Sequence, residues 1–441
     1  MGNDRISALP DYLLTKILLD LPTKDSIKTG VLSTRWRNLW LSVPGLDLKV
    51  SDYLPLHQEV LTSFIETFME FNLGSHLQKF KIKNDHFKYN VSSDWIATAV
   101  DRRVRVLDVE AKNVLFVIDT MPMNIFQSKT LVSLRLANVE LENQDIVVSL
   151  PCLKIMHLDN ICYGEDGPLI VEKLISGCPV LEDLTVVRIY YEDLETMPVL
   201  RVKSQTLKVF HYMFKWGMPT TYFSVEIDAP ELKYMRFRDS QSDKILVKNL
   251  SSLFKIDLDT EFNVKFGGSP LESEDLRKRD IIRGFLTGIS SVRHMIISQP
   301  TSEVLYHYSK LEPIPRFHNL SHLQAAFSSS SLQLLPAFLE SCPNLKNLIL
   351  NYSVSEEPEQ IDFTTVPRCL ISTLEYVEIK KLKMKVETGI KLGNYFLENS
   401  AVLKKLNLSF TDSPMANEES ESYKKLLIST KLSPTCQVII D

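Results

Sequence analysis

Apolar residues recur in a fixed six-residue frame along most of the chain. The frame has apolar side chains at its first, fourth and sixth positions, as in Leu131, Leu134 and Leu136, and about thirteen copies occur between Leu77 and Leu408. Most copies follow one another by roughly 21 to 29 residues. The alternation at the end of the frame predicts a short strand that buries every second side chain.

One such unit leaves its own apolar edge uncovered, so neighbouring units are expected to stack in parallel and share a core. Helical patterns between copies, at residues 95–100, 169–175, 281–286 and 332–339, predict helices outside the sheet. The spacing is that of a leucine-rich-repeat array. The asparagine of regular repeats is replaced by Val139, Ile161 or Ile189, which predicts an irregular array. A long gap near residues 259–280 predicts an insertion.

The cysteine positions favour packing over chemistry. Cys178 and Cys342 stand in similar segments that lead into a repeat, Ser-Gly-Cys-Pro-Val-Leu and Glu-Ser-Cys-Pro-Asn-Leu. We therefore expect both thiols at equivalent, buried places. None of the six cysteines forms a Cys-x-x-Cys pair or has zinc-finger spacing to histidine. This usage is typical of reduced thiols in a reducing compartment.

The outward-facing side chains of the strands form a candidate binding surface. Each strand turns one row of side chains to the core and the other row to the open face of the sheet. We expect this second row to be largely basic and aromatic and to capture a partner protein through acidic or polar segments. An ordinary solvated face is the alternative. The candidate substrate-binding residues are Lys79, Lys81, Arg135, His157, His211, Tyr234, Arg236, Arg238, His294 and His322.

Before the repeats, the chain has the pattern of three short helices. Pro10 suits the start of the first helix, and Pro22 ends it. Its apolar stripe comprises Leu13, Leu14, Ile17, Leu18 and Leu21. A second helix follows from Thr23, and a third from Ser33 is expected to stack Trp36 on Trp40. So small a bundle does not bury this much apolar surface, so part of it must meet either the following domain or another protein.

Many positions in this segment match one pattern in order. They are Leu9, Pro10, Ile17, Leu18, Leu21, Pro22, Val31, Leu32, Ser33, Arg35, Trp36, Arg37, Leu39 and Trp40. The segment closely resembles the F-box of plant F-box proteins. The resemblance implies docking on the Skp-type adaptor of a cullin–RING ubiquitin ligase. The expected adaptor contacts are Leu9, Pro10, Ile17, Leu18, Val31, Leu32, Trp36 and Trp40.

The C-terminal part carries a second resemblance. The segments Val-Pro-Arg-Cys-Leu at 366–370, Leu-Glu-Tyr-Val-Glu-Ile at 374–379 and the stretch 395–406 stand in the frame of the FBD domain. This domain often ends plant F-box leucine-rich-repeat proteins. The expected fold is therefore α/β. It comprises a three-helix F-box at 1–42, an irregular leucine-rich-repeat solenoid of parallel strands with outer helices at 43–365, and an FBD-type strand and helix cap at 366–441.

Composition and charge exclude several classes. Hydrophobic residues make up 44% and charged residues 24%, which excludes global disorder. The net charge of −5 gives no general basis for binding nucleic acid or membranes, and no apolar run is long enough to span a bilayer. We therefore expect a protein of the cytoplasm, the nucleus or both.

No sequence motif recommends an enzyme or a cofactor. Nucleotide-binding glycine motifs, a nucleophile elbow and the His-Glu-x-x-His metal motif are all absent from the sequence. His318 and His322 are four residues apart, but they flank the entry to a predicted strand, where helical spacing has no meaning. We expect no metal site and no cofactor.

The resemblances imply a non-catalytic substrate-recognition subunit of an SCF-type ubiquitin ligase. Its partners would be the Skp-type adaptor, through it a cullin–RING complex, and a target protein held on the repeat face. The alternative is a recognition or scaffold protein in which the F-box-like segment only caps the repeats.

Overall fold

The structure is a computed structural model that divides into two compact units. The first comprises Met1–Leu207 with Lys215–Pro219, and the second comprises Lys208–Phe214 with Thr220–Asp441. The described residues are 6–53, 58–71, 76–85, 91–112, 119–141, 147–163, 167–189, 199–215, 223–264, 273–352, 363, 365–382, 387–410 and 431–440.

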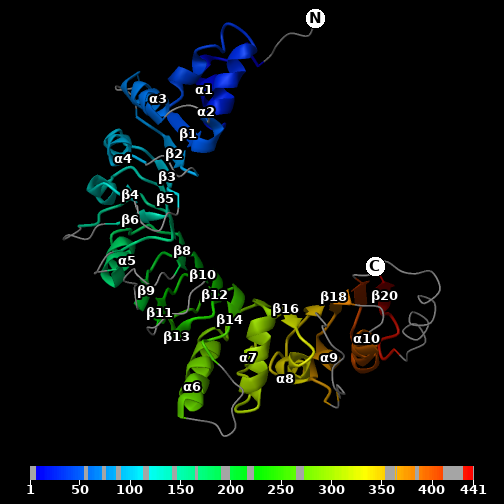
Figure 1. Ribbon diagram of the computed structural model, residues 1–441. Coiled ribbons are helices and arrows are strands. Elements are labelled where there is room, and N and C mark those ends of the chain that lie inside the picture. The colour runs from blue at the N-terminus through cyan, green and yellow to red at the C-terminus, as the bar shows by residue number, and fades with distance from the viewer. Residues whose placement is uncertain are drawn as a thin grey trace, which may run out of the picture. The chain divides into compact units, whose positions relative to one another are not determined.

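The first unit begins with short helices and continues as alternating strands and helices (Figure 1). Its N-terminal helices are α1 (Asp11–Leu19), α2 (Thr23–Lys28) and the 3-10 segments η1 (Thr29–Val31) and η2 (Leu39–Ser42). The elements that follow are β1 (Gly45–Lys49), η3 (Val50–Tyr53), α3 (Gln58–Phe71), β2 (Lys79–Lys83), α4 (Ser93–Asp101), β3 (Val106–Glu110), β4 (Asp119–Thr120), η4 (Met123–Gln127), β5 (Ser133–Ala137), β6 (Val139–Glu140), β7 (Ile155–Asp159), α5 (Gly167–Ser176), β8 (Asp183–Ile189) and β9 (Val199–Lys203).

Six strands of the first unit form one parallel sheet in the order β1-β2-β3-β5-β7-β8. The fourth position of the apolar frame lies in register across them, in the row Leu46, Phe80, Leu107, Leu134, Met156 and Leu184. Each of these side chains is buried. Since each strand shares its buried row with its neighbours, the core is continuous along the stack.

The second unit repeats this plan. Its elements are β10 (Val209–Lys215), β11 (Phe223–Asp228), β12 (Tyr234–Asp239), β13 (Ser242–Lys248), β14 (Lys255–Thr260), α6 (Ser273–Gly288), β15 (His294–Ile297), α7 (Gln299–Ser309), β16 (His322–Phe327), η5 (Ser331–Leu334), α8 (Leu335–Glu340), β17 (Asn347–Tyr352), α9 (Arg368–Ser372), β18 (Tyr376–Leu382), α10 (Glu387–Asn399), β19 (Lys405–Phe410) and β20 (Gln437–Ile440).

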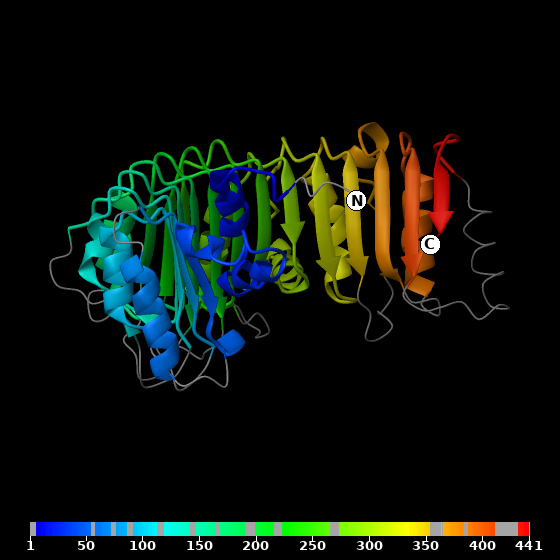
Figure 2. The same cartoon turned by 90° about the horizontal axis from the view of Figure 1, so that it is seen from above.

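Nine strands of this unit form a parallel sheet in the order β10-β12-β14-β15-β16-β17-β18-β19-β20. Two further strands, β11 and β13, pair with each other in parallel, and α6 packs on β13. In each unit the helices between strands lie on one side of the main sheet, and Figure 2 shows the strands side by side. The other side is the open face. The predicted α/β fold of parallel repeats with outer helices is confirmed.

The predicted helices are present except the one from Ser33, and the helix predicted at residues 332–339 is η5 followed by α8. The helix predicted from Ser33 is instead a turn over residues 34–38 followed by η2. Backbone hydrogen bonds here span three residues, from Trp36 N–H to Ser33 and from Leu39 N–H to Trp36, which is 3-10 geometry. Trp40 stacks on Phe64 of α3 rather than on Trp36, with ring centroids 5.9 Å apart. In the predicted insertion, residues 265–272 lie outside the described ranges, and the part after them is the start of α6.

Candidate functional site

The N-terminal helices have a small hydrophobic core of their own. It comprises Leu14 and Leu18 of α1 with Trp36, Leu39 and Val43, while Leu9, Leu19 and Leu21 pack against it. Trp36 is only 4% exposed, and its indole N–H donates a 2.8 Å hydrogen bond to the Ser7 hydroxyl. Leu18 is equally buried. Trp36 and Leu18, both expected at the adaptor contact, therefore lie inside the fold.

Arg35 fastens the third segment to the chain before α1. Its guanidinium donates hydrogen bonds to the carbonyl oxygens of Ser7 and Leu9 and to the Asp11 carboxylate, where the closest contact is 2.7 Å. These bonds and the indole bond of Trp36 place residues 35 and 36 against residues 7–11. The Arg-Trp pair of the motif therefore stabilises the fold of this segment. Sequence reasoning missed this role.

Several apolar side chains of the same segment are left in solvent. Val31 is 88% exposed, Leu32 67% and Ile17 45%, and Pro10 is exposed as well. Two further exposed side chains, Ile6 and Tyr12, were not among the expected contacts. Leu9 and Trp40 are half-buried. Of the expected adaptor contacts, only Pro10, Ile17, Val31 and Leu32 are thus largely accessible.

The same segment also packs on β1 and on η3, which follows it. The Asp47 N–H of β1 donates to the Thr23 hydroxyl at 2.8 Å, and Lys24 forms a 3.1 Å ion pair with Asp52. Gly45 sits so close to Leu19 that a Cβ there would lie 2.4 Å from the leucine Cδ1. The helices therefore do cap the sheet, and the exposed apolar residues remain in addition to that contact.

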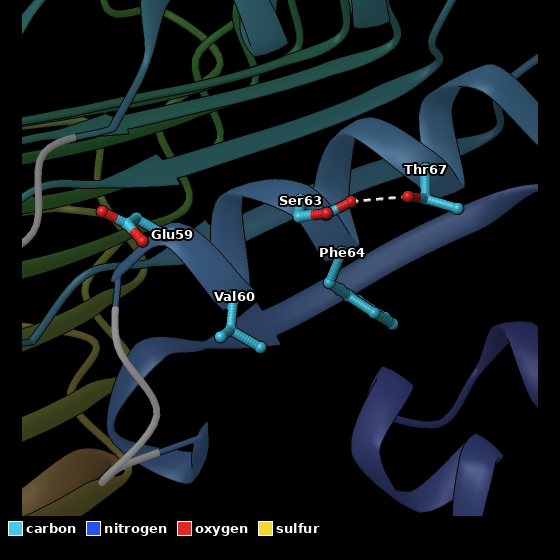
Figure 3. A pocket seen from close by; sticks show the side chains of 5 residues that line it. All are labelled: Glu59, Val60, Ser63, Phe64 and Thr67. Atoms are coloured by element: carbon cyan, nitrogen blue, oxygen red, sulfur yellow. Dashed lines mark hydrogen bonds between the residues drawn. The ribbon is translucent and has the colours of Figure 1, made fainter.

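A shallow depression runs along α3, lined by Glu59, Val60, Ser63, Phe64 and Thr67 (Figure 3). The Thr67 hydroxyl donates to the Ser63 carbonyl at 2.7 Å, so these polar groups serve the helix itself. Figure 3 shows Val60 and Phe64 on the same side of the helix. Because all the lining residues come from one helix, this depression lacks the converging groups of a small-molecule site.

On the open face of the first unit, charges alternate from strand to strand. The register places Asp47, Lys81, Asp108, Arg135 and His157 side by side on five consecutive strands. Lys79 binds Asp47 at 3.0 Å, and Arg135 binds Asp108 at 2.9 Å and Glu110 at 3.0 Å. Lys81 lies 3.8 Å from Asp108, and His157 lies 4.0 Å from Asp159. The four predicted residues of this unit thus lie together, but acids that were left out of the prediction pair with them.

The pKa of Glu110 reflects these ion pairs. Burial of Glu110 favours the neutral form, but hydrogen bonds from Lys83 and Arg135 outweigh this, so the pKa of Glu110 lies below its usual value. The expectation of a largely basic face is therefore wrong for the described part of this unit. Its face is a charge-paired ladder.

The remaining six candidates lie on the open face of the second unit. Arg236 binds Asp257 at 2.8 Å, and Arg238 lies 4.0 Å from the same carboxylate. The rings of His211 and Tyr234 meet edge to face at 5.3 Å. His294 and His322, one strand apart, stack at 4.1 Å with their planes 7° apart. Asn347 continues this row and lies 2.6 Å from the His322 Nε2.

The two cysteines in matching segments lie where the sequence predicts. Cys178 and Cys342 are both buried at equivalent places before a strand. Within the described ranges, no three His, Cys, Asp or Glu side chains gather as metal ligands would. No helix in the described part of the chain is long and apolar enough to span a bilayer.

Comparison with known families agrees with this layout. The F-box domain model matches residues 6–47, a model described as FBD-associated F-box protein At5g56370, LRR repeats, matches 92–253, and the FBD model matches 361–408.

Similar proteins in Arabidopsis thaliana extend over the whole chain. The putative F-box/FBD/LRR-repeat protein At5g44950 is 65% identical, with 100% of both chains covered. The F-box/FBD/LRR-repeat protein At2g26030 is 56% identical with the same coverage, and the FBD-associated F-box protein At5g27750 is 47% identical over 100% of this chain and 99% of that protein. With identities this high over the whole length, this chain belongs to the F-box/FBD/LRR-repeat protein family of plants.

Proposed function

We propose that this protein is a substrate-recognition subunit of an SCF-type cullin–RING ubiquitin ligase. F-box proteins generally have this role and are generally non-catalytic adaptors. In the proposal, the F-box docks on a Skp-type adaptor, and the open face of the repeats captures a target protein for ubiquitination. The observation that carries it is the exposure of Val31, Leu32 and Ile17 in a segment whose own core is already complete.

Exposed leucine and valine side chains favour a protein partner. Single exposed apolar residues are common, but Val31 and Leu32 are adjacent in the sequence. The same segment of about 40 residues also exposes Ile17, Tyr12 and Ile6, so its surface carries several apolar side chains. Burying a Leu or Val side chain in an interface stabilises a complex by about 1.5–3 kcal/mol. Two or three such residues are enough to dominate the affinity of an interface.

The proposed activity requires no bond chemistry from this chain. Holding a target beside the conjugating enzyme raises its local concentration and makes the encounter intramolecular. The chain's contribution is then the affinity of two surfaces, one for the adaptor and one for the target.

The test is binding of the full-length chain to a purified Skp-type adaptor. We expect Val31→Asp with Leu32→Asp to weaken the complex by at least about 100-fold, since two buried apolar contacts would be lost and two charges buried. The matched control is Leu169→Asp on α5, where the leucine is 51% exposed on a repeat helix. Equal adaptor affinity in the double variant and the wild type would refute the docking assignment.

The alternative is a recognition protein in which the F-box only caps the repeats. The bond from Asp47 to Thr23 and the stacking of Trp40 on Phe64 favour a capping contribution. If the wild-type chain is folded yet binds no Skp-type adaptor, and the variant at residues 31 and 32 still captures the same target, the capping function alone remains.

A further inference from the structure

The open face of the second unit has an unpaired basic edge. The residues just before its strands follow one another along the sheet, since backbone hydrogen bonds of 2.9–3.0 Å join Lys233 to Phe254, Phe254 to Arg293, Arg293 to Ser321, and Ser321 to Lys346. Adjacent strands lie about 4.8 Å apart, so this edge runs for roughly 19 Å. We call Lys233, Phe254, Lys255, Arg293, Ser321 and Lys346 the basic edge.

The cations of this edge differ from those in the middle of the face. Arg236 and Arg238 share Asp257, but Lys233, Lys255, Arg293 and Lys346 form no ion pair within 4.0 Å among the described residues. Lys233, Arg293 and Lys346 are also exposed. The edge therefore carries net positive charge on a chain whose overall net charge is −5. Beyond Lys346 the basic edge ends at Glu375, whose carboxylate forms a 2.6 Å ion pair with Lys404 and interacts more weakly with Lys346.

The pKa values of the neighbouring histidines are lowered by burial and by nearby cations. Burial lowers the pKa of His294, and the nearby His322 and Lys255 lower it further. Burial also lowers the pKa of His322, with a further contribution from Lys346. Both shifts favour the neutral imidazole, so positive charge on this edge comes from the four cations.

The spacing of the charges selects the shape of the ligand. Lys233, Lys255, Arg293 and Lys346 lie at the starts of β12, β14, β15 and β17, so their row spans four strand spacings, about 19 Å. One phosphate group cannot contact a row of this length, whereas carboxylates repeated along an extended peptide can follow it.

The aromatic rings argue against a nucleic acid on this edge. Phe254 packs on His294 at 4.6 Å, His294 stacks on His322, and Lys255 lies over the Tyr234 ring at 5.3 Å. Of these four rings only Phe254 is exposed, at 46%, whereas single-stranded nucleic acids stack successive bases on several open aromatic rings.

We propose that the basic edge binds an extended peptide segment of the captured protein that carries several Asp or Glu side chains. This inference rests on the proposed function, because it names the chemistry of the target. In this proposal the target contacts the N-terminal edge of the strands in the second unit, rather than the charge-paired middle of the face.

The test uses the full-length chain and three labelled probes: a short peptide of alternating Glu and Ser, the same peptide with Gln for Glu, and an oligouridylate of equal length. Fluorescence anisotropy at low and high salt measures each affinity. We expect the Glu peptide to bind at low salt, the Gln peptide to bind at least about tenfold more weakly, and added salt to weaken the complex.

Charge reversal locates the site. Arg293→Glu with Lys346→Glu is expected to weaken Glu-peptide binding by roughly tenfold or more. The control, Lys244→Glu with Lys248→Glu, changes the net charge equally at two exposed lysines of β13 and is expected to leave binding unchanged. Equal binding of the Glu and Gln peptides, equal effects of the two double variants, or stronger binding of the oligouridylate would each overturn the proposal.

The adaptor experiment is independent of this one. A wild-type chain that binds the adaptor but not the Glu peptide would overturn the basic edge alone. Glu-peptide binding without adaptor binding would overturn the ligase function and leave the edge as a peptide-binding surface.

Discussion

Trp36 shows how a residue in a recognition motif can act through the fold. The sequence pattern marks it as an adaptor contact, but its ring is packed among Leu14, Leu18 and Leu39 and its N–H is bonded to Ser7. No local signal distinguishes a tryptophan that faces a partner from one that faces its own core. The stripe of the first helix has the same ambiguity, since Leu14 and Leu18 are buried while Ile17 is exposed.

We therefore expect Trp36→Ala to act on stability first. Truncating a buried tryptophan costs about 3–5 kcal/mol, whereas Trp36→Phe keeps most of the packing and loses the bond to Ser7, about 1 kcal/mol. Urea unfolding of the full chain, followed by circular dichroism, measures both. A Trp36→Ala chain as stable as the wild type that bound the adaptor weakly would instead restore the direct contact.

The thiols offer a second test at this scale. Burial raises the pKa of Cys178 and of Cys369 to about 12, and raises that of Cys342 as well, whereas Cys152 is exposed. Because the thiolate is the reacting form, iodoacetamide at pH 8 should alkylate Cys152 well before these three. Mass spectrometry of peptides after timed quenching measures the order. Fast labelling of Cys342 in the folded chain would contradict the buried packing role.

At the level of elements, local pattern located the strands that carry the repeat frame but not β9, β11, β13 or β20. It also missed features that depend on contacts far along the chain. The frame works because alternate burial in a strand is a local property. The third N-terminal segment is not an α-helix, and the bonds that hold it run from Arg35 to Ser7 and Leu9, more than 25 residues earlier. The helix α7 had a local signal that was not used, a Ser298 cap followed by Pro300 in the first turn.

Gly45 of β1 lies close against Leu19 of α1. A Cβ at this position would lie 2.4 Å from the Leu19 Cδ1 and 3.2 Å from the Lys79 Cβ. We expect Gly45→Ala to lower the free energy of unfolding by about 1–3 kcal/mol, because a packed site has no room for the methyl group. Gly284→Ala is the matched control, since nothing lies within 4 Å of its added Cβ and it is in α6. Equal stability of the two variants would show that Leu19 moves aside at little cost.

At the scale of the molecule, the family and the repeat plan were predictable because they rest on patterns repeated many times. The electrostatics of the open face were not, because the candidate row omitted acids that the same frame places there. Asp47, Asp108 and Asp257 occupy outward positions and pair with predicted cations on neighbouring strands. Pairing across a sheet depends on which strands are neighbours and on their register, which the spacing of one repeat does not give.

The junction between Thr23 and Asp47 also affects how this protein is best dissected. β1 is the terminal strand of its sheet, and the Thr23 hydroxyl occupies the Asp47 N–H on the side away from β2. Deleting the F-box, in order to bind targets without the ligase, would expose β1 as an uncovered edge strand. Such edges promote self-association. A full-length chain that has lost adaptor binding through substitutions at Val31 and Leu32 keeps this strand edge covered. It is therefore the better reagent for capturing proteins that bind the repeats.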